Sequence, residues 1–135
     1  MVDFNVKLVN LSPVMAQQST LGFMWSNRTF QNERSYKNEN MYTTLVYHFP
    51  GEGDVEDLGI SEGNKSKNIS SSVDWVAFKQ QYFTSAFISA GGLNATAEFK
   101  NSAKGGADFM KEYYSTITLP LSAKQTTYNY AFYYG

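Results

Sequence analysis

Residues 93–100 read Leu-Asn-Ala-Thr-Ala-Glu-Phe-Lys, an uninterrupted alternation of apolar and polar side chains. Leu93, Ala95, Ala97 and Phe99 fall on one side of this alternation, and the polar residues fall on the other. A β-strand points successive side chains to opposite faces. The stretch therefore predicts a strand with one buried face and one face in water.

The same period of two recurs in five further runs along the chain. They are rich in Thr, Val, Ile, Tyr and Phe, which strands prefer, and Gly, Asn and Ser punctuate the chain between them. Their apolar members are Phe4, Val6 and Leu8; Leu21, Phe23 and Trp25; Leu45, Tyr47 and Phe49; Ile117, Leu119 and Leu121; and Tyr128, Tyr130, Phe132 and Tyr134. The run around Leu45 alternates less regularly, because Val46 lies on its polar side. Six such runs predict an all-β fold, most simply an antiparallel β-sandwich.

The composition excludes several classes of function. The chain has 135 residues, no Cys, one His and a formal net charge of −1, and 16% of it is aromatic. Disulfides, cysteine-based zinc sites and a histidine-dependent catalytic triad are therefore excluded. The balance of eleven Lys and Arg against twelve Asp and Glu argues against nucleic-acid binding. We expect a protein that is not an enzyme and that has no cofactor and no metal site.

The length fits one domain over residues 1–135, with a long exposed connection over 50–72. Five Pro and Gly residues interrupt this connection, its first half is acidic, and its second half is rich in Ser, Asn and Lys. It lacks the Asp-x-Asp-x-Asp-Gly framework of a calcium loop, so a solvated loop is the favoured interpretation. Long loops often carry contacts. The candidate partner-contact residues are Glu52, Asp54, Glu56, Asp57, Lys65 and Lys67.

Other segments have simpler or more ambiguous patterns. Residues 31–40 are polar and predict a loop or a strand on the solvent side. Two Gly-Gly pairs, at Gly91 and at Gly105, predict tight turns. Residues 108–114 fit either one helical turn or a strand. In residues 73–89, the spacing of Trp75, Lys79 and the following aromatic residues mildly favours a helix over two strands.

Residues 73–89 also read Val-Asp-Trp-Val-Ala-Phe-Lys-Gln-Gln-Tyr-Phe-Thr-Ser-Ala-Phe-Ile-Ser. This segment resembles the signature of the large periplasmic domain of the YidC membrane protein insertase family, in its Bacteroidetes branch. The signature residues are Trp75, Gln80, Gln81, Tyr82 and Phe83. The stretch 91–99 and the aromatic-Tyr-Gly ending at 132–135 resemble later strands of that domain. The resemblance covers residues 75–135 specifically, is generic over 2–12, and leaves most of 15–72 unmatched.

The resemblance implies a β-supersandwich, similar to the galactose mutarotase fold, on the periplasmic side of the bacterial inner membrane. It also implies a non-catalytic domain that supports insertion and folding of nascent membrane proteins, by scaffolding and by contact with accessory proteins of the Sec translocon. On this interpretation, residues 73–78 and 81–88 are two strands with a break between them, in place of a helix.

The chain is short for a complete supersandwich, so the resemblance identifies it as the C-terminal portion of the periplasmic domain. It carries neither the membrane helix nor the insertase core of the family, and no functional position of that core is present in it. The strand edges left exposed would favour pairing between two copies of the chain, as a homodimer.

Each candidate residue also has a structural interpretation. Trp75, Tyr82, Phe83 and Phe87 could line a groove for an apolar client, but large aromatic residues more often form the core. Gln80 and Gln81 are expected to satisfy backbone groups at the strand break or to face solvent.

The single histidine and the C-terminal tyrosines raise two further alternatives. His48 ends an apolar run with no second His or Cys, so a strand-end residue is favoured over a metal ligand. The tyrosines of 128–134 could stack on sugars in a β-sandwich carbohydrate-binding module, which is the alternative function. Cross-strand packing is the favoured role for them. Mutarotase-like catalysis would need further histidines beside a carboxylate.

Overall fold

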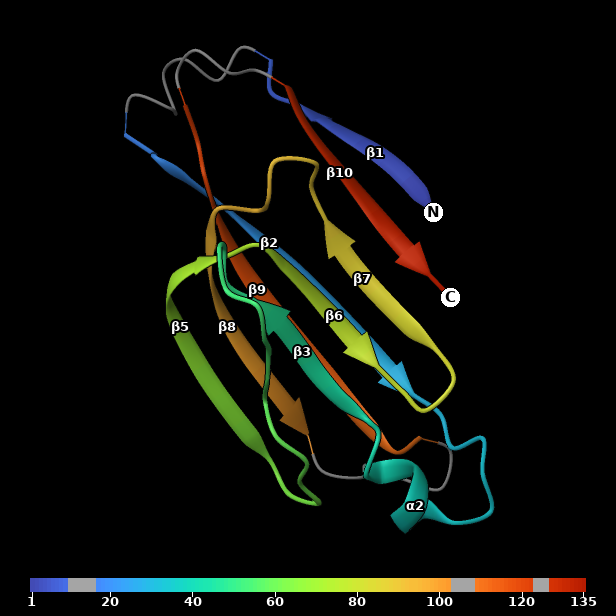
Figure 1. Cartoon of the computed structure of the whole chain (residues 1–135). Helices are drawn as coiled ribbons and strands as arrows, with labels where there is room; N and C mark the ends of the chain where they lie inside the picture. The colour runs from blue at the N-terminus through green and yellow to red at the C-terminus, as the bar shows by residue number, and fades with distance from the viewer. Residues whose placement is uncertain (10–16, 103–108, 123–126) are drawn as a thin grey trace.

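The structure, a computed structural model, describes residues 1–9, 17–102, 109–122 and 127–135. Two antiparallel sheets pack face to face, which confirms the prediction of an all-β sandwich (Figure 1). In the six-stranded sheet the order is β1 (Val2–Lys7), β10 (Thr127–Tyr134), β7 (Thr84–Ile88), β6 (Trp75–Lys79), β3 (Thr44–His48) and β4 (Val55–Asp57). In the four-stranded sheet it is β2 (Thr20–Thr29), β9 (Lys111–Pro120), β8 (Ala95–Ser102) and β5 (Lys65–Val73).

The core lies between the sheets and is built largely from aromatic rings. Phe87 of β7 is fully buried, and its ring centroid lies 4.7 Å from that of Phe23 and 5.3 Å from that of Tyr130. Phe99 of β8 is also fully buried and packs against Tyr47 at 5.0 Å. Phe23, Tyr47, Phe99 and Tyr130 belong to the apolar sides of the alternating runs, whereas Phe87 lies in the ambiguous segment 73–89. The period of two thus places the rings on the inner faces of both sheets.

Residues 73–89 form two strands, not a helix. β6 pairs with both β3 and β7, and β7 pairs in turn with β10. The helical spacing was misleading because pairing on both sides of each strand, a tertiary effect, overrides a weak local period. The two strands implied by the resemblance are therefore confirmed within different bounds, Trp75–Lys79 and Thr84–Ile88, with the break at residues 80–83, whereas Val73 ends β5 of the other sheet. In the ambiguous segment 108–114, the described residues from Lys111 onward belong to strand β9.

The prediction of a loop or strand over 31–40 is wrong for residues 36–40, which form the short helix α2 (Tyr36–Asn40), whereas residues 31–35 form a loop. The hydroxyl of Ser35 accepts a hydrogen bond from the Asn38 amide and caps the helix. The buried carboxylate of Glu39 accepts hydrogen bonds from the backbone amides of Asn32 and Glu33. Charged acceptors make strong hydrogen bonds with backbone donors, so Glu39 folds this polar segment against the end of the sandwich (Figure 1).

The sequence analysis described residues 50–72 as a long exposed connection, but most of this segment belongs to two strands and the loops beside them. It contains β4 and most of β5, which pair with β3 and β8. The sequence pattern did not reveal β5, because it is rich in Ser, Lys and Asn and buries only Ile69 and Val73. An edge strand is held mainly by backbone hydrogen bonds to one neighbour, so it needs little apolar alternation.

The predicted turn at Gly91 and Gly92 is confirmed, whereas the pair at Gly105 lies outside the described residues. The Gly92 amide donates to the Ser89 carbonyl at 3.0 Å, and Gly92 has a φ of +77°. A Cβ on Gly92 would collide with the carboxylate of Asp74, whereas a Cβ on Gly91 would meet open space.

Replacing Gly92 by alanine is expected to lower the free energy of unfolding by about 1–2 kcal/mol, because an L side chain at positive φ is strained. The displaced Asp74 carboxylate adds to this cost. Chemical denaturation of G92A beside G91A measures the effect. The Gly91 variant should differ from the parent by less than about 0.5 kcal/mol. Equal losses in the two variants would contradict the assignment of the strained position.

Candidate functional site

The six candidate contact residues lie together on one side of the sandwich, which we call the charged flank. It consists of Glu52, Asp54, Glu56, Asp57, Lys65 and Lys67, and every one of these residues is exposed. β4 is an edge of the six-stranded sheet and β5 is an edge of the four-stranded sheet, so the flank joins two sheet edges. The carboxylates and the ammonium groups therefore form one mixed, solvent-facing surface.

Lys67 links the two edges of the charged flank. Its Nζ lies 5.2 Å from the centroid of the Tyr47 ring, in a cation–π arrangement. The Tyr47 side chain is the main cause that raises the pKa of Lys67, and the carboxylates of Glu56 and Asp57 act in the same direction. The ammonium of Lys67 thus stays charged at neutral pH and is held beside the acidic residues of β4.

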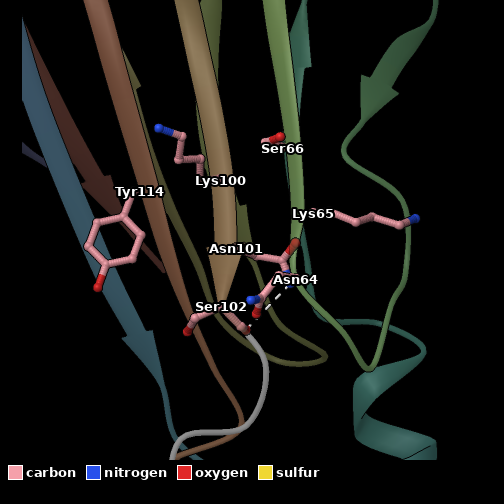
Figure 2. A pocket seen from close by; sticks show the side chains of 7 residues that line it. All are labelled: Asn64, Lys65, Ser66, Lys100, Asn101, Ser102 and Tyr114. Carbon is pink, nitrogen blue, oxygen red and sulfur yellow. Dashed lines mark hydrogen bonds between the residues drawn. The ribbon is translucent and has the colours of Figure 1, made fainter.

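A shallow polar hollow lies next to this flank, on the outer face of the four-stranded sheet. Its volume is about 390 Å³, and its lining residues are Asn64, Lys65, Ser66, Lys100, Asn101, Ser102 and Tyr114. Figure 2 shows that the Lys65 side chain points away from the Lys100 and Tyr114 side chains. The amide of Asn101 donates to the Gly63 carbonyl at 3.1 Å. The residues of the hollow thus do not converge on one point.

A second hollow, which we call the sheet-face trough, lies on the outer face of the six-stranded sheet. It measures about 360 Å³ and is lined by Val46, Trp75, Ala77, Lys79, Thr84, Ala86, Ile88 and Tyr133. Except for Lys79 and Thr84, these are apolar or aromatic residues on the face opposite to the core. Among the lining residues, the sequence analysis named only Trp75 and Tyr133 as candidates for binding. The irregular alternation around Val46 was a usable signal, since it places an apolar residue on the outer face.

His48 packs against Trp75, which lines one end of the sheet-face trough. Its imidazole stacks on the Trp75 ring, with centroids 5.6 Å apart and planes at 4°. Nδ1 lies 3.2 Å from a carboxylate oxygen of Asp74, and Nε2 lies 2.9 Å from the carbonyl oxygen of Glu52. Both ring nitrogens thus lie within hydrogen-bonding distance of an oxygen of a neighbouring residue. The histidine therefore ends β3 and ties it to the following turn, as expected for a strand-end residue.

The other signature residues form the turn between β6 and β7. The Gln80 amide donates to the Phe83 carbonyl at 2.8 Å, and the Gln80 side chain donates to the Phe30 carbonyl at 3.2 Å. The Gln81 side-chain amide donates to the Tyr82 hydroxyl at 3.0 Å. The Gln80 side chain thus joins the turn between β6 and β7 to the backbone that follows β2.

The prediction that Trp75, Tyr82, Phe83 and Phe87 form the core is correct for Phe87 and wrong for Tyr82 and Phe83. Phe87 is fully buried, whereas Tyr82 is 61% exposed and Phe83 is 56% exposed. Residues of a hairpin turn project beyond the sheet, so the opposite sheet does not cover them. Trp75 is half-buried in the wall of the sheet-face trough.

The C-terminal tyrosines divide between the two faces of β10 and its end. Tyr128 and Tyr130 are buried, whereas Tyr133 and Tyr134 are exposed. Packing therefore uses two of the four rings, and no continuous platform of four rings faces solvent. This arrangement supports the structural role and gives the carbohydrate-binding alternative no extended stacking surface.

Comparison with known proteins decides between these alternatives. The sequence model of the family described as "YidC periplasmic domain" matches residues 1–135. The chain belongs to this family. It is 32% identical to "Membrane protein insertase YidC" of Bacteroides fragilis over 139 aligned positions, which cover all of this chain and 22% of that protein. The resemblance to the YidC family, in its Bacteroidetes branch, is therefore confirmed.

Two further relatives carry the same name. The insertase YidC of Parabacteroides distasonis is 32% identical, with all of this chain and 21% of that protein covered. The YidC of Porphyromonas gingivalis is 30% identical, with 82% of this chain and 18% of that protein covered. The chain thus spans about a fifth of the length of the curated relatives it matches. No solved structure matches the chain.

The described part of this YidC periplasmic domain was compared with the requirements of a membrane span and of a metal site. No helix within the described ranges combines the length and the apolar character needed to cross a bilayer. Among the same residues, His, Asp and Glu side chains form no group of three or more that would hold a metal ion. The described surfaces thus include the charged flank, the polar hollow and the sheet-face trough.

Proposed function

We propose that this chain is a non-catalytic periplasmic domain of a YidC-type inner-membrane insertase. It supports the insertion and folding of nascent membrane proteins by scaffolding and by contact with accessory proteins of the Sec translocon. The match of the YidC periplasmic family to the whole chain carries this proposal. The relatives are named membrane protein insertases, and the chain corresponds to about a fifth of each of them.

The contacts that His48 makes within the protein support a role without catalysis. General acid–base chemistry needs a titratable group that reaches the substrate. Both ring nitrogens of His48 face neighbours within the protein, and Trp75 covers one face of its ring. The residue therefore serves the architecture of β3 and the turn that follows.

The charged flank is the surface we assign to the Sec contact. Its six charged side chains are exposed, and they project from the edge strands β4 and β5 and from the loop that precedes β4. Interspersed charges at an interface rim steer association and set specificity more than they add affinity. Such a contact suits a partner that must bind and release, and it should weaken as salt concentration rises.

Neutralising the acidic part of the flank tests this assignment. In the triple variant E52Q/D54N/E56Q we expect binding to Sec accessory proteins to weaken about tenfold, mainly through a slower association rate. Surface plasmon resonance at low and high salt measures the rate and its salt dependence. Substitution is preferable to deletion of residues 52–72, because deletion would remove β4 and most of β5.

A triple variant with the same change in net charge serves as the control. D3N/E33Q/E98Q removes three negative charges from positions outside the charged flank. It should bind like the parent chain. Equal affinities of the two triple variants would remove the charged flank as the contact surface, and the family assignment would remain unaffected by that result.

A further inference from the structure

The only histidine of the chain lies where three connections meet at one end of the six-stranded sheet. His48 ends β3, Asp74 joins β5 of one sheet to β6 of the other, and Glu52 belongs to the turn that leads to β4. The third connection is the turn at Gly92, which packs against the Asp74 carboxylate. Only 18% of the His48 side chain is exposed. A change at this ring therefore acts on all three connections.

Both polar neighbours of the ring are hydrogen-bond acceptors. Nδ1 lies 3.2 Å from a carboxylate oxygen of Asp74, and Nε2 lies 2.9 Å from the carbonyl oxygen of Glu52. A neutral imidazole has one N–H donor and one bare nitrogen, whereas the charged imidazolium has two donors. In either tautomer, the neutral ring therefore leaves one nitrogen lone pair facing an oxygen lone pair. Only the charged ring satisfies both neighbours.

In a neutral ring, the contact with Glu52 is the weaker of the two. A carboxylate accepts hydrogen bonds more strongly than a carbonyl, so the single proton stays on Nδ1, beside Asp74. The backbone also fixes Asp74, whose amide donates to the His48 carbonyl at 2.7 Å and whose carbonyl accepts from the Leu93 amide at 2.9 Å. The Glu52 amide donates to the Phe49 carbonyl at 3.2 Å, a bond within its own turn. Loss of the second proton therefore frees the turn and leaves the junction in place.

We propose that His48 is a proton-dependent latch, which holds the turn before β4 when its ring is charged and releases this turn when the ring is neutral. Histidine is the side chain that ordinarily changes charge between about pH 5 and pH 8. The folded chain gains the second contact only with the protonated ring, so the stabilisation is present at low pH and is lost as the pH rises. The latch is therefore closed at mildly acidic pH.

The charges on the elements around His48 do not oppose a charged ring. Asp74 is its ion-pair partner. The residues opposite His48 in its two strand pairs are Val55 of β4 and Trp75 of β6, so neither pair brings a charge to the ring. The other charged residues of these two strands and of the three connections are Glu52, Asp54, Glu56, Asp57 and Lys79. Acids outnumber the single lysine, which lies at the far end of β6.

The latch acts on the acidic half of the charged flank. Glu52 and Asp54 lie between β3 and β4, and Glu56 and Asp57 lie on β4 itself. β4 has three residues and ends its sheet, where it pairs with β3 through residues 46–48. Segments with few backbone pairs open at low cost, so a free turn also loosens β4. The consequence for partner binding rests on the proposed function, whereas the latch itself does not.

Amide hydrogen exchange measured by NMR tests the latch without a partner, because protection factors already correct for the intrinsic effect of pH on exchange. Between about pH 5.5 and pH 7.5, protection of the Glu52 and Leu58 amides should fall about three- to tenfold in the parent chain. The Leu58 amide follows β4 and donates to the Leu45 carbonyl at 2.9 Å. The Tyr42 amide, which donates to the Glu39 carbonyl at the other end of β3, should not change.

Two single substitutions separate the latch from a purely structural contact. His48→Gln has no titrating ring, so protection of the Glu52 amide should be low and equal at both pH values. Asp74→Asn offers an amide donor to Nδ1 and leaves the ring proton on Nε2 for Glu52. A neutral ring then satisfies both neighbours, so protection should stay high at both pH values. Circular dichroism checks that each variant is folded, and His48→Gln decides alone if Asp74→Asn is not.

Three results would overturn the proposal. One is a parent chain whose Glu52 protection is the same at both pH values. Another is His48→Gln with the same fall in protection as the parent, because a different group would then be responsible. The third is a folded Asp74→Asn variant that keeps the fall seen in the parent. Since no partner is present, each of these outcomes is independent of whether the charged flank binds Sec accessory proteins.

Discussion

Replacing Phe87 by alanine is expected to lower the free energy of unfolding by about 3–5 kcal/mol, the largest effect of any substitution considered for this chain. Phe87 is fully buried at the centre of the core. Its ring centroid lies 4.7 Å from that of Phe23 and 5.3 Å from those of Tyr130 and Phe132. Alanine would leave a cavity lined by rings from both sheets, which cannot all close around it.

Phe83 provides the matched control, since it is the same residue type in the same signature segment. It is 56% exposed at the turn between β6 and β7. Phe83→Ala should therefore change stability by no more than about 0.5 kcal/mol. Urea denaturation followed by tryptophan fluorescence measures both variants. Similar losses from the two variants would show that the signature residues share one environment, contrary to the structure.

Replacing Lys111 by methionine is expected to stabilise the chain at pH 7 by up to about 3 kcal/mol. Lys111 begins β9 and is only 1% exposed. Burial is the main cause that lowers the pKa of its ammonium from 10.5 to about 8, and Lys65 lowers it further, while Glu62 opposes the shift. The folded state therefore carries the cost of a buried charge at neutral pH, and methionine keeps the length of the side chain without that charge.

The cost of burying the Lys111 ammonium should make the free energy of unfolding depend on pH. Between about pH 8 and pH 10 the unfolded chain keeps the Lys111 proton while the folded chain loses it. The free energy of unfolding should thus rise with pH in this window. Below about pH 8 both states hold the proton, so the penalty is constant there.

A pH series of denaturation curves from pH 6 to pH 10 checks this prediction. Lys111→Met should remove the rise above pH 8, so its curve and that of the parent should approach each other toward pH 10. Lys37→Met, at an exposed lysine of α2, should follow the parent at every pH. Parallel curves for the parent and Lys111→Met would contradict the assigned cost of burying this ammonium.

The sequence predicted the part of the fold that depends on alternating burial. The run from Leu93 to Phe99 and the run from Leu21 to Trp25 both appear as strands with their apolar sides partly or fully covered. It did not predict β5, because an edge strand needs few apolar residues, nor α2, because a capping serine and the buried Glu39 stabilise five residues that have no helical period.

Of the candidate surfaces, the sequence pointed to the charged residues but not to the hollow on the outer face of the six-stranded sheet. The charges of residues 52–67 were recognisable as a solvent-facing group, because charged side chains rarely lose water without a partner. The sheet-face trough was missed, since it joins Val46, Trp75 and Tyr133 from strands far apart in the chain. Only strand order places such residues side by side.

By itself, the sequence determined the fold class, the family and the absence of cysteine chemistry, because residue type and short-range period carry this information. The tertiary structure alone decided that Phe87 is buried while Phe83 is exposed, and that β5 pairs with β8 in the four-stranded sheet. The physical reason is that a side chain's burial depends on what lies across from its strand. Long-range pairing sets that environment, and residues close in sequence do not.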